Sequence, residues 1–436
     1  MKKIIILIIY VINLMPVLAT EALIPLNAGK SRSLNSNWQL CVVKGIVNSV
    51  DENAEYKEIP VPGCWESYGF CEAKCDYPDS LTGFYKTTFS VPKEWVNSHV
   101  FIRFDGVLYG YNLYINDNLV GSWESSYNTK TFDITQYIKP QETQRLAMRV
   151  YSKYKGSDFD CNDDWAPNGI FRDVTLYSVS GAYLDDLFVQ TVEVSEEEYA
   201  DVKIDYSIQN QSENTVFKYK ILSPNGNVIG EYKDARDIRI YNPSLWTAET
   251  PHLYTIEAEL QTNDATNIYC QKFGIRKITI DGNVFKLNNH PIKLRGVNCH
   301  STDSRTMKVV GDTLTLKDMK LMKEASINCI RTSHYPREPH FYDMADSLGF
   351  YIIDEVPFGY GDNLLKDETI LPILKTRAEY TVKRDRMHPS VIIWSVGNEN
   401  ELTPICEEVG KYVKLLDNSR PICFPQEGSY FKKINY

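Results

Sequence analysis

The chain of 436 residues lacks an excess of positive charge: 47 lysines and arginines stand against 57 aspartates and glutamates, a net charge of −10. A protein that neutralises the phosphates of nucleic acid carries the opposite balance, so we expect no nucleic-acid partner. Apolar residues are plentiful at 43%, which excludes a disordered chain. At roughly 150 residues per domain, the length predicts about three globular domains.

Long apolar runs are missing after the first twenty residues, so no later segment is expected to span a membrane. The one such run, residues 4–18, follows Lys2 and Lys3 and precedes Ala19, which is typical of a secretory signal. The sequence predicts a signal peptide over 1–19, no stable membrane anchor, and an exported protein, periplasmic or secreted. A single N-terminal membrane helix is the alternative, although the run is shorter than the about 20 residues that a bilayer needs.

The ten cysteines lack the repeated spacing of a disulfide framework. Cys71 and Cys75 are the one close pair, without the second pair or the histidines of a structural zinc site. We therefore expect either a local disulfide or two free thiols there.

Two consecutive regions have the period-two pattern of β-strands. Residues 83–92, 100–106 and 111–117 alternate between turns, which predicts an all-β sandwich over 27–180. A second set of strands, such as 253–260, fills 182–281, and about one hundred residues is the size of an immunoglobulin-like sandwich.

From residue 284 onwards, short apolar runs alternate with helical stretches. The predicted strands are 292–297, 327–330, 350–353, 391–396 and 422–425. The predicted helices are 313–326, a stretch carrying Phe341, Met344, Ala345 and Leu348 that ends at Gly349, and one carrying Leu371, Leu374, Ala378 and Val382. This alternation is typical of βα units around a buried parallel sheet.

Polar residues follow four of these strands. They are Asn298-Cys299-His300, Arg331 to Pro336, Asp354-Glu355, and Gly397-Asn398-Glu399-Asn400. In a (β/α)₈ barrel the carboxyl ends of the strands carry the active site. A single such residue is more often a loop cap or a surface group, but four in register predict a site.

Glu399 is the candidate acid or base, because it comes just after a nearly continuous apolar strand. We expect this setting to desolvate the carboxyl group and raise its pKa, so that it can give a proton to a leaving group. Asn398 beside it offers a donor and an acceptor suited to a sugar hydroxyl. A purely structural polar cluster is the alternative that the spacing leaves open.

These motifs, with Arg384 to Val396 leading into Gly397-Asn398-Glu399, resemble glycoside hydrolase family 2, the β-galactosidase and β-glucuronidase family. Trp165 to Val174 resembles that family's sugar-binding sandwich, and Leu245-Trp246 with Pro251 to Tyr254 its immunoglobulin-like domain. The resemblance implies a jelly-roll sandwich over 27–180, an immunoglobulin-like sandwich over 182–281, and the N-terminal part of a TIM barrel over 284–436.

The resemblance also implies a retaining hydrolase of terminal β-linked sugars, β-galactosides first, with Glu399 as acid/base and Asn398 on the sugar's 2-hydroxyl. It places His300 and His334 on the substrate and Arg331 near the nucleophile. Asp163 would reach the sugar from the first sandwich, with Asp164 as the neighbouring alternative.

A retaining enzyme needs a second carboxylate about 5–5.5 Å from the first, as the nucleophile. Only 37 residues follow Glu399, and a barrel typically needs about 250 in all. Glu427 matches a fifth-strand loop, and Glu355, the other carboxylate at the barrel edge, lies on the third strand and is expected among the substrate-binding residues. We therefore expect a C-terminally truncated chain whose sequence carries no nucleophile motif.

Residues 356–361 offer no carboxylate or imidazole where some galactosidases of the family bind magnesium, so we expect no metal and no cofactor. The expected partner is a β-galactoside-type oligosaccharide or polysaccharide, and a homo-oligomer is compatible with the sequence. β-Glucuronidase is the nearest rival. An inactive or purely carbohydrate-binding protein is the alternative from another class, because an open half-barrel leaves strand edges unpaired.

Overall fold

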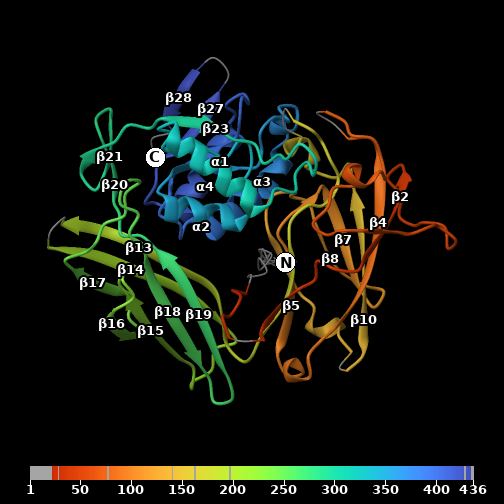
Figure 1. The fold of residues 1–436 in the computed structure, drawn as a ribbon, viewed down its shortest axis with the longest axis horizontal. Coiled ribbons are helices and arrows are strands. Elements are labelled where there is room, and N and C mark those ends of the chain that lie inside the picture. The colour runs from red at the N-terminus through yellow and green to blue at the C-terminus, as the bar shows by residue number, and fades with distance from the viewer. Residues whose placement is uncertain are drawn as a thin grey trace, which may run out of the picture.

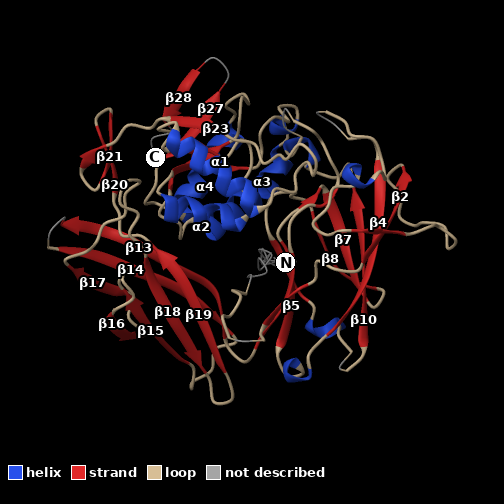
Figure 2. Cartoon of the chain, viewed as in Figure 1, coloured by secondary structure: helices blue, strands red, loops and turns tan. Residues whose placement is uncertain are grey.

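The computed structural model describes residues 22–27, 29–75, 78–139, 141–161, 164–195, 198–426 and 429–433. Two β-sandwiches flank a compact α/β body that holds the C-terminal third of the chain (Figure 1). Figure 2 shows that the long helices all belong to this α/β body, while strands make up both sandwiches. The predicted order of two sandwiches and an incomplete α/β barrel is confirmed.

The first sandwich consists mainly of a six-stranded and a four-stranded antiparallel sheet, with a short β-ribbon beside them. The six-stranded sheet has the order β3 (Lys57–Ile59), β2 (Trp38–Lys44), β4 (Leu81–Ser90), β10 (Thr143–Tyr151), β7 (Gly110–Ile115), β8 (Asn118–Trp123). The second sheet has the order β1 (Ser31–Ser33), β12 (Val174–Val179), β5 (His99–Phe104), β9 (Lys130–Asp133), and the ribbon pairs β6 (Val107–Leu108) with β11 (Gly169–Ile170). Alternate residues such as Leu40, Tyr85 and Met148 point into the core between the sheets, as the period-two pattern predicts.

The second sandwich pairs a three-stranded sheet with a four-stranded one. The strands are β13 (Tyr183–Ser195), β14 (Tyr199–Gln209) and β17 (Asp237–Tyr241), then β16 (Val228–Lys233), β15 (Val216–Leu222), β18 (Tyr254–Gln261) and β19 (Thr266–Phe273). β18 alternates strictly between buried and half-buried residues, so one of its faces forms the core. A small antiparallel sheet of β20 (Ile278–Asp281), β21 (Val284–Leu287) and β22 (His290–Pro291) then leads into the α/β body.

The α/β body contains a sheet whose first five strands are parallel. Its order is β23 (Gly296–Asn298), β24 (Cys329–Arg331), β25 (Tyr351–Val356), β26 (Val391–Val396), β27 (Ile422–Gln426) and the antiparallel β28 (Ser429–Lys433). The prediction of a strand from residue 292 is wrong, because strand pairing begins only at Gly296. The Asn328 side chain binds the carbonyl of Lys293 and the amide of Arg295 instead, at 3.0 and 2.8 Å.

Four α-helices accompany the parallel strands: α1 (Asp312–Glu324), α2 (Pro339–Leu348), α3 (Leu371–Asp385) and α4 (Pro404–Leu416). The predicted helical faces are confirmed where they were most periodic, since Phe341 and Ala345 of α2 and Leu374, Ala378 and Val382 of α3 are buried. Gly349 ends α2 with φ +74°, and an added Cβ would lie 2.1 Å from the Ala248 carbonyl oxygen, so only glycine fits.

Buried arginines join each sandwich to the α/β body. Arg377 of α3 binds both carboxylate oxygens of Asp160 in the first sandwich, at 2.6 and 3.0 Å. Arg276, at the end of the second sandwich, donates to the carbonyls of Pro389 and Val391, each at 2.7 Å. Arg377 also donates to the carbonyl of Pro357, just after β25, so its contact fixes the first sandwich beside the carboxyl ends of the barrel strands.

The predictions for the signal peptide, the close cysteine pair and membrane-spanning segments have different outcomes. The signal peptide over 1–19 and the residues Asp163 and Glu427 lie outside the described residues. Cys71 and Cys75 are free thiols, which selects the second of the two expected states. Within the described ranges, no helix is both long and apolar enough to cross a membrane.

Candidate active site

The carboxyl edge of the parallel sheet gathers most of the predicted site residues. Arg331 ends β24, Glu355 lies near the end of β25, and Asn398 follows β26 after Gly397. His334 comes from the loop after β24, and its imidazole ring is 5.3 Å from that of His300, from the loop after β23. The prediction that these loops meet at one edge is confirmed.

Glu355 is the centre of a buried cluster. Its carboxylate is fully buried and accepts hydrogen bonds from Arg331 Nε at 2.8 Å and Ser395 Oγ at 2.7 Å, while His334 Nδ1 lies 2.9 Å from its other oxygen. Both carboxylate oxygens are therefore occupied by protein groups. A carboxylate held in this way positions its neighbours and is not free to attack a substrate.

Asn398 is held by the same cluster, with its donor left over. Arg331 Nη2 donates to Asn398 Oδ1 at 2.8 Å, and because arginine can only donate, this contact fixes which end of the amide is oxygen. Asn398 Nδ2 is buried and finds no acceptor among the described residues. Buried donors are almost always paired, so this amide is poised for an acceptor from outside the described chain.

Glu399 differs from its prediction. The sequence predicted a desolvated carboxyl group, but the side chain is exposed to solvent. The backbone turns sharply after β26, with φ +85° at Gly397 and φ +54° at Glu399, and the Glu399 amide donates to the Pro425 carbonyl at 3.0 Å. The apolar strand therefore ends before Glu399, and the turn delivers its carboxylate to the open edge of the sheet.

The first sandwich contributes Asp164 to this edge. Asp164 Oδ2 accepts from Thr302 at 2.9 Å, forms an ion pair with the buried Lys308 ammonium, and lies 3.3 Å from His300 Nδ1. Burial raises the pKa of the Asp164 carboxyl, but the hydrogen bond from His300 and the Lys308 charge outweigh it and hold the pKa well below its usual range. Asp164 thus fastens the sandwich to the loop that carries His300.

A stacked pair of tyrosines also lies where the first sandwich meets the barrel. Tyr127 of the first sandwich and Tyr335 of the barrel lie parallel, with ring centroids 3.8 Å apart. Lys308 donates to the Tyr335 hydroxyl at 2.8 Å; burial lowers the pKa of Lys308, but Tyr335 and Asp164 outweigh it and raise that pKa. Both buried cations described at this edge bind protein groups. Arg331 binds Glu355 and Asn398, and Lys308 binds Asp164.

Asp354 lies on the opposite face of β25 from Glu355. It is connected to the Glu355 cluster through Thr332. Tyr342 and Thr332 donate to Asp354 Oδ1 at 2.6 and 3.1 Å, and the Glu355 amide donates to the same Thr332 hydroxyl at 3.1 Å. Burial and the neighbouring Asp385 charge raise the pKa of Asp354 well above its usual range. Asp354 thus links the packing of α2 to the position of Glu355 through Tyr342 and Thr332.

Two residues of the site, Ser395 and Lys308, were not predicted from the sequence. Ser395 is the one hydroxyl in the otherwise apolar β26, and that isolated polar residue was the signal that could have found it. Lys308 lies in a loop whose sequence has no recognisable pattern. Its role emerges only from the contact with Asp164, which is 144 residues away in the chain.

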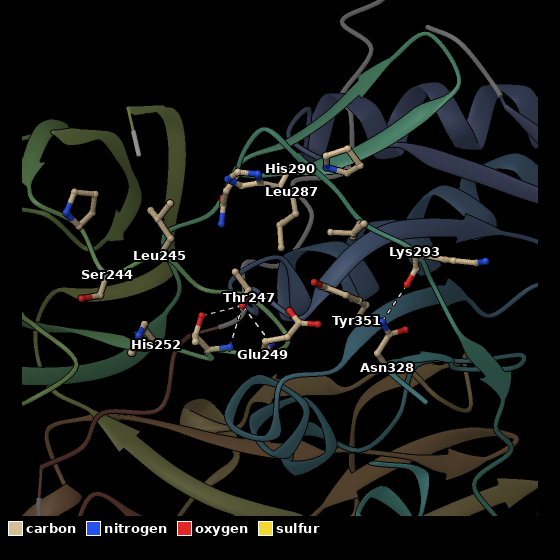
Figure 3. A pocket seen from close by; sticks show the side chains of 15 residues that line it. Ser244, Leu245, Thr247, Glu249, His252, Leu287, His290, Lys293, Asn328 and Tyr351 are labelled. Atoms are coloured by element: carbon tan, nitrogen blue, oxygen red, sulfur yellow. Dashed lines mark hydrogen bonds between the residues drawn. The ribbon is translucent and has the colours of Figure 1, made fainter. Parts of the chain in front are cut away.

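A wide crevice of about 620 Å³, drawn in Figure 3, shares no lining residue with this site. It is lined by Asn328 before β24, Tyr351 at the start of β25, and the loop 243–252 of the second sandwich. Because these residues mark the amino ends of the strands, the crevice is on the side of the barrel that serves stability.

Three family descriptions match consecutive parts of the chain. "Glycosyl hydrolases family 2, sugar binding domain" matches residues 32–180, "Glycosyl hydrolases family 2" matches 182–276, and "Glycosyl hydrolases family 2, TIM barrel domain" matches 278–435.

Curated relatives and solved structures agree with these matches. The β-galactosidase of Leuconostoc mesenteroides is 30% identical over 91% of this chain and 43% of its own length, and that of Lactococcus lactis is 34% identical over 78% and 35%. The chain thus spans less than half the length of these relatives. The Ruminococcus gnavus β-glucuronidase in complex with D-glucuronic acid has a similar fold, with a TM-score of 0.81 at 24% identity, covering 93% of this chain and 74% of that one. Bacteroides uniformis β-glucuronidase 2 gives a TM-score of 0.80 at 24% identity, covering 92% and 53%.

The matched regions follow one another in the order of the two sandwiches and the barrel, and they leave few residues between them. The conclusion from sequence, fold and comparisons is the same: this chain belongs to glycosyl hydrolase family 2.

Proposed function

We propose that the residues gathered at the carboxyl edge of the parallel sheet, the carboxyl-edge site, hydrolyse terminal β-linked sugars, β-galactosides first. The mechanism is a retaining one in which Glu399 is the acid/base. The observation that carries this proposal is the pair formed by Asn398 and Glu399. Asn398 offers a buried amide donor with no acceptor among the described residues, and the next residue offers an exposed carboxyl group. A bound sugar supplies both the missing acceptor and a leaving-group oxygen.

In this proposal each residue of the site has its own role. Asn398 binds the sugar's 2-hydroxyl, and Arg331 keeps the amide turned so that its nitrogen faces the ligand. His300 and His334 contact the other hydroxyls, and Asp163, which lies outside the described residues, stays a sequence-based candidate for a contact with the sugar. Glu399 gives its proton to the glycosidic oxygen as the bond to the anomeric carbon breaks.

The nucleophile is not assigned to a described residue. Glu355 is excluded because Arg331, Ser395 and His334 occupy its carboxylate. Retention requires a carboxylate about 5–5.5 Å from the acid/base. Among the described residues, the site therefore has the proposed acid/base and the sugar-binding groups but no assigned nucleophile, and we expect these groups to give no turnover with water alone.

The galactoside is favoured over the glucuronide by the charges at the site. A glucuronide carries a carboxylate that needs a free cation. Among the described residues of the cluster, Arg331 and Lys308 are the buried cations, and both are already bound to carboxylates of the protein. The β-glucuronidase alternative stays open through the structural neighbours, whose similarity concerns the fold.

Azide, acting as an external nucleophile, provides the test. Its nitrogen bonds to the anomeric carbon as the carbon–oxygen bond to the nitrophenyl group breaks, and the released oxygen takes the proton of Glu399. We expect azide-dependent nitrophenol release from 4-nitrophenyl β-galactoside, little from the β-glucuronide, and at least about tenfold less from Asn398→Ala. Faster release from the glucuronide would select that alternative. Sugar binding without azide-dependent release would instead identify a carbohydrate-binding protein.

A further inference from the structure

A second groove lies on the outer face of the first sandwich, on the sheet formed by β2, β4, β10 and β7. It encloses about 660 Å³ and is lined by residues of these strands and of the segment before β3. In Figure 1, β2 and β4 lie at the side of the molecule away from helices α1 to α4. The groove is therefore separate from the carboxyl-edge site.

The register of the strands explains why the sheet forms a groove here. Gln39, Lys86, Ala147 and Tyr114 stand side by side on consecutive strands, so the small Ala147 lies between two long side chains. One row further, Phe84 pairs with Arg149. Because residues two apart in a strand share a face, both rows point out of the sandwich, while Tyr85 and Met148 point into its core.

Aromatic rings and cations alternate along the groove. Lys86 Nζ lies 3.6 Å from the ring centroid of Tyr56. The Arg149 guanidinium lies 5.8 Å from the Phe84 ring and 5.4 Å from the Tyr114 ring. All three rings are half-buried, so each keeps exposed surface on which an apolar face of a sugar ring can pack.

The charges of the lining favour an anionic ligand. Three cations, Lys86, Arg145 and Arg149, face one carboxylate, Asp117, which is paired with Arg145 at 2.5 Å, although the chain as a whole carries −10. Arg149 Nη1 donates to Asn48 Oδ1 at 3.3 Å and to the Tyr151 hydroxyl at 3.4 Å, whereas Nη2 and the buried Nε have no acceptor among the described residues. A guanidinium with an unused donor fits a carboxylate or a sulfate group.

We propose that this groove is a non-catalytic binding site for an acidic saccharide chain, with sugar rings on Tyr56, Phe84 and Tyr114 and an acidic substituent on Arg149. The site is independent of the proposed hydrolysis, since none of its residues belongs to the carboxyl-edge cluster.

Calorimetric titration of the full chain tests the proposal, with oligogalacturonides as carboxylated probes, carrageenan oligosaccharides as sulfated probes and α-linked malto-oligosaccharides as neutral ones, because the latter carry no terminal β-galactoside for the carboxyl-edge site. We expect at least one acidic probe to bind at least tenfold more tightly than the neutral probe, and binding to weaken as salt is raised. Tyr114→Ala and Arg149→Gln should each weaken it at least tenfold. Tyr241→Ala, at an exposed tyrosine of the other sandwich, should leave it unchanged.

Thermal melting checks that the variants fold, and Lys86→Gln, at an exposed side chain, gives a second reading if Arg149→Gln does not. Equal binding of neutral and acidic probes would overturn the proposal, as would no binding or binding that survives both groove variants. A change from oligomer to monomer in Tyr114→Ala would also overturn it, because a second copy of the chain would then cover the groove.

Discussion

Glu355 and Glu399 lie at the ends of neighbouring strands, yet their surroundings are opposite. Glu355 is fully buried and held by Arg331, Ser395 and His334. The Glu399 side chain is exposed, and its carboxylate has no partner among the described residues. Glu355 therefore holds its neighbours in place, whereas the Glu399 carboxylate stays accessible to solvent. The catalytic candidate is the less constrained of the two.

Removing the charge of Glu355 should have the largest effect. Glu355→Gln leaves the buried Arg331 guanidinium without its anion, and breaking a buried ion pair costs about 3–5 kcal/mol. Urea unfolding followed by circular dichroism measures this loss. The control Glu401→Gln changes an exposed carboxylate and should stay within about 0.5 kcal/mol of the parent. A loss below about 1 kcal/mol for Glu355→Gln would show that the cluster is not held by this charge.

Asn398→Asp should have the next largest effect, and on binding. Aspartate keeps an oxygen for Arg331 but replaces the Nδ2 donor, so about one hydrogen bond to the sugar is lost, which corresponds to about tenfold weaker binding. Calorimetric titration with a non-hydrolysable thiogalactoside measures the change. Asn225→Asp, in an exposed turn of the second sandwich, is the matched control. Unchanged affinity in Asn398→Asp would remove Asn398 from the sugar site.

The pH dependence of stability extends the comparison to Asp164. Its pKa is lowered in the folded state, so its contribution to stability is present above the ordinary aspartate pKa of about 3.9 and is lost as the pH falls through the folded value. Between about pH 5 and pH 3, the free energy of unfolding should fall less steeply for Asp164→Asn than for the parent. Asp158→Asn, at an exposed aspartate of the same sandwich, should follow the parent curve. Parallel curves for the parent and Asp164→Asn would contradict the claim that Lys308 and His300 lower the pKa of Asp164 in the folded protein.

Much of this arrangement follows from local sequence patterns. The apolar runs at β25 and β26 and the helical period of α2 predicted elements that the structure confirms, because in each the buried face determines the pattern. The polar residues just after the strands predicted a shared edge, since parallel strands all end on the same side.

What the sequence could not predict depends on contacts between distant residues. The burial predicted for Glu399 was inferred from β26, but the turn at Gly397 and Glu399 decides the exposure. The strand predicted from residue 292 failed because the Asn328 side chain satisfies the Lys293 and Arg295 backbone groups. Lys308 has no local signal at all, because its partner Asp164 belongs to another domain.

The most direct test of the role of Glu399 compares two leaving groups in the presence of azide. 2,4-Dinitrophenolate leaves without a proton, whereas 4-nitrophenolate gains more from protonation by an acid. Glu399→Gln should therefore reduce azide-dependent release of 4-nitrophenol from its β-galactoside at least tenfold more than release of 2,4-dinitrophenol, with thiogalactoside binding within about threefold of the parent. Equal losses for both leaving groups, or no loss for either, would contradict the assignment of Glu399 as the acid/base.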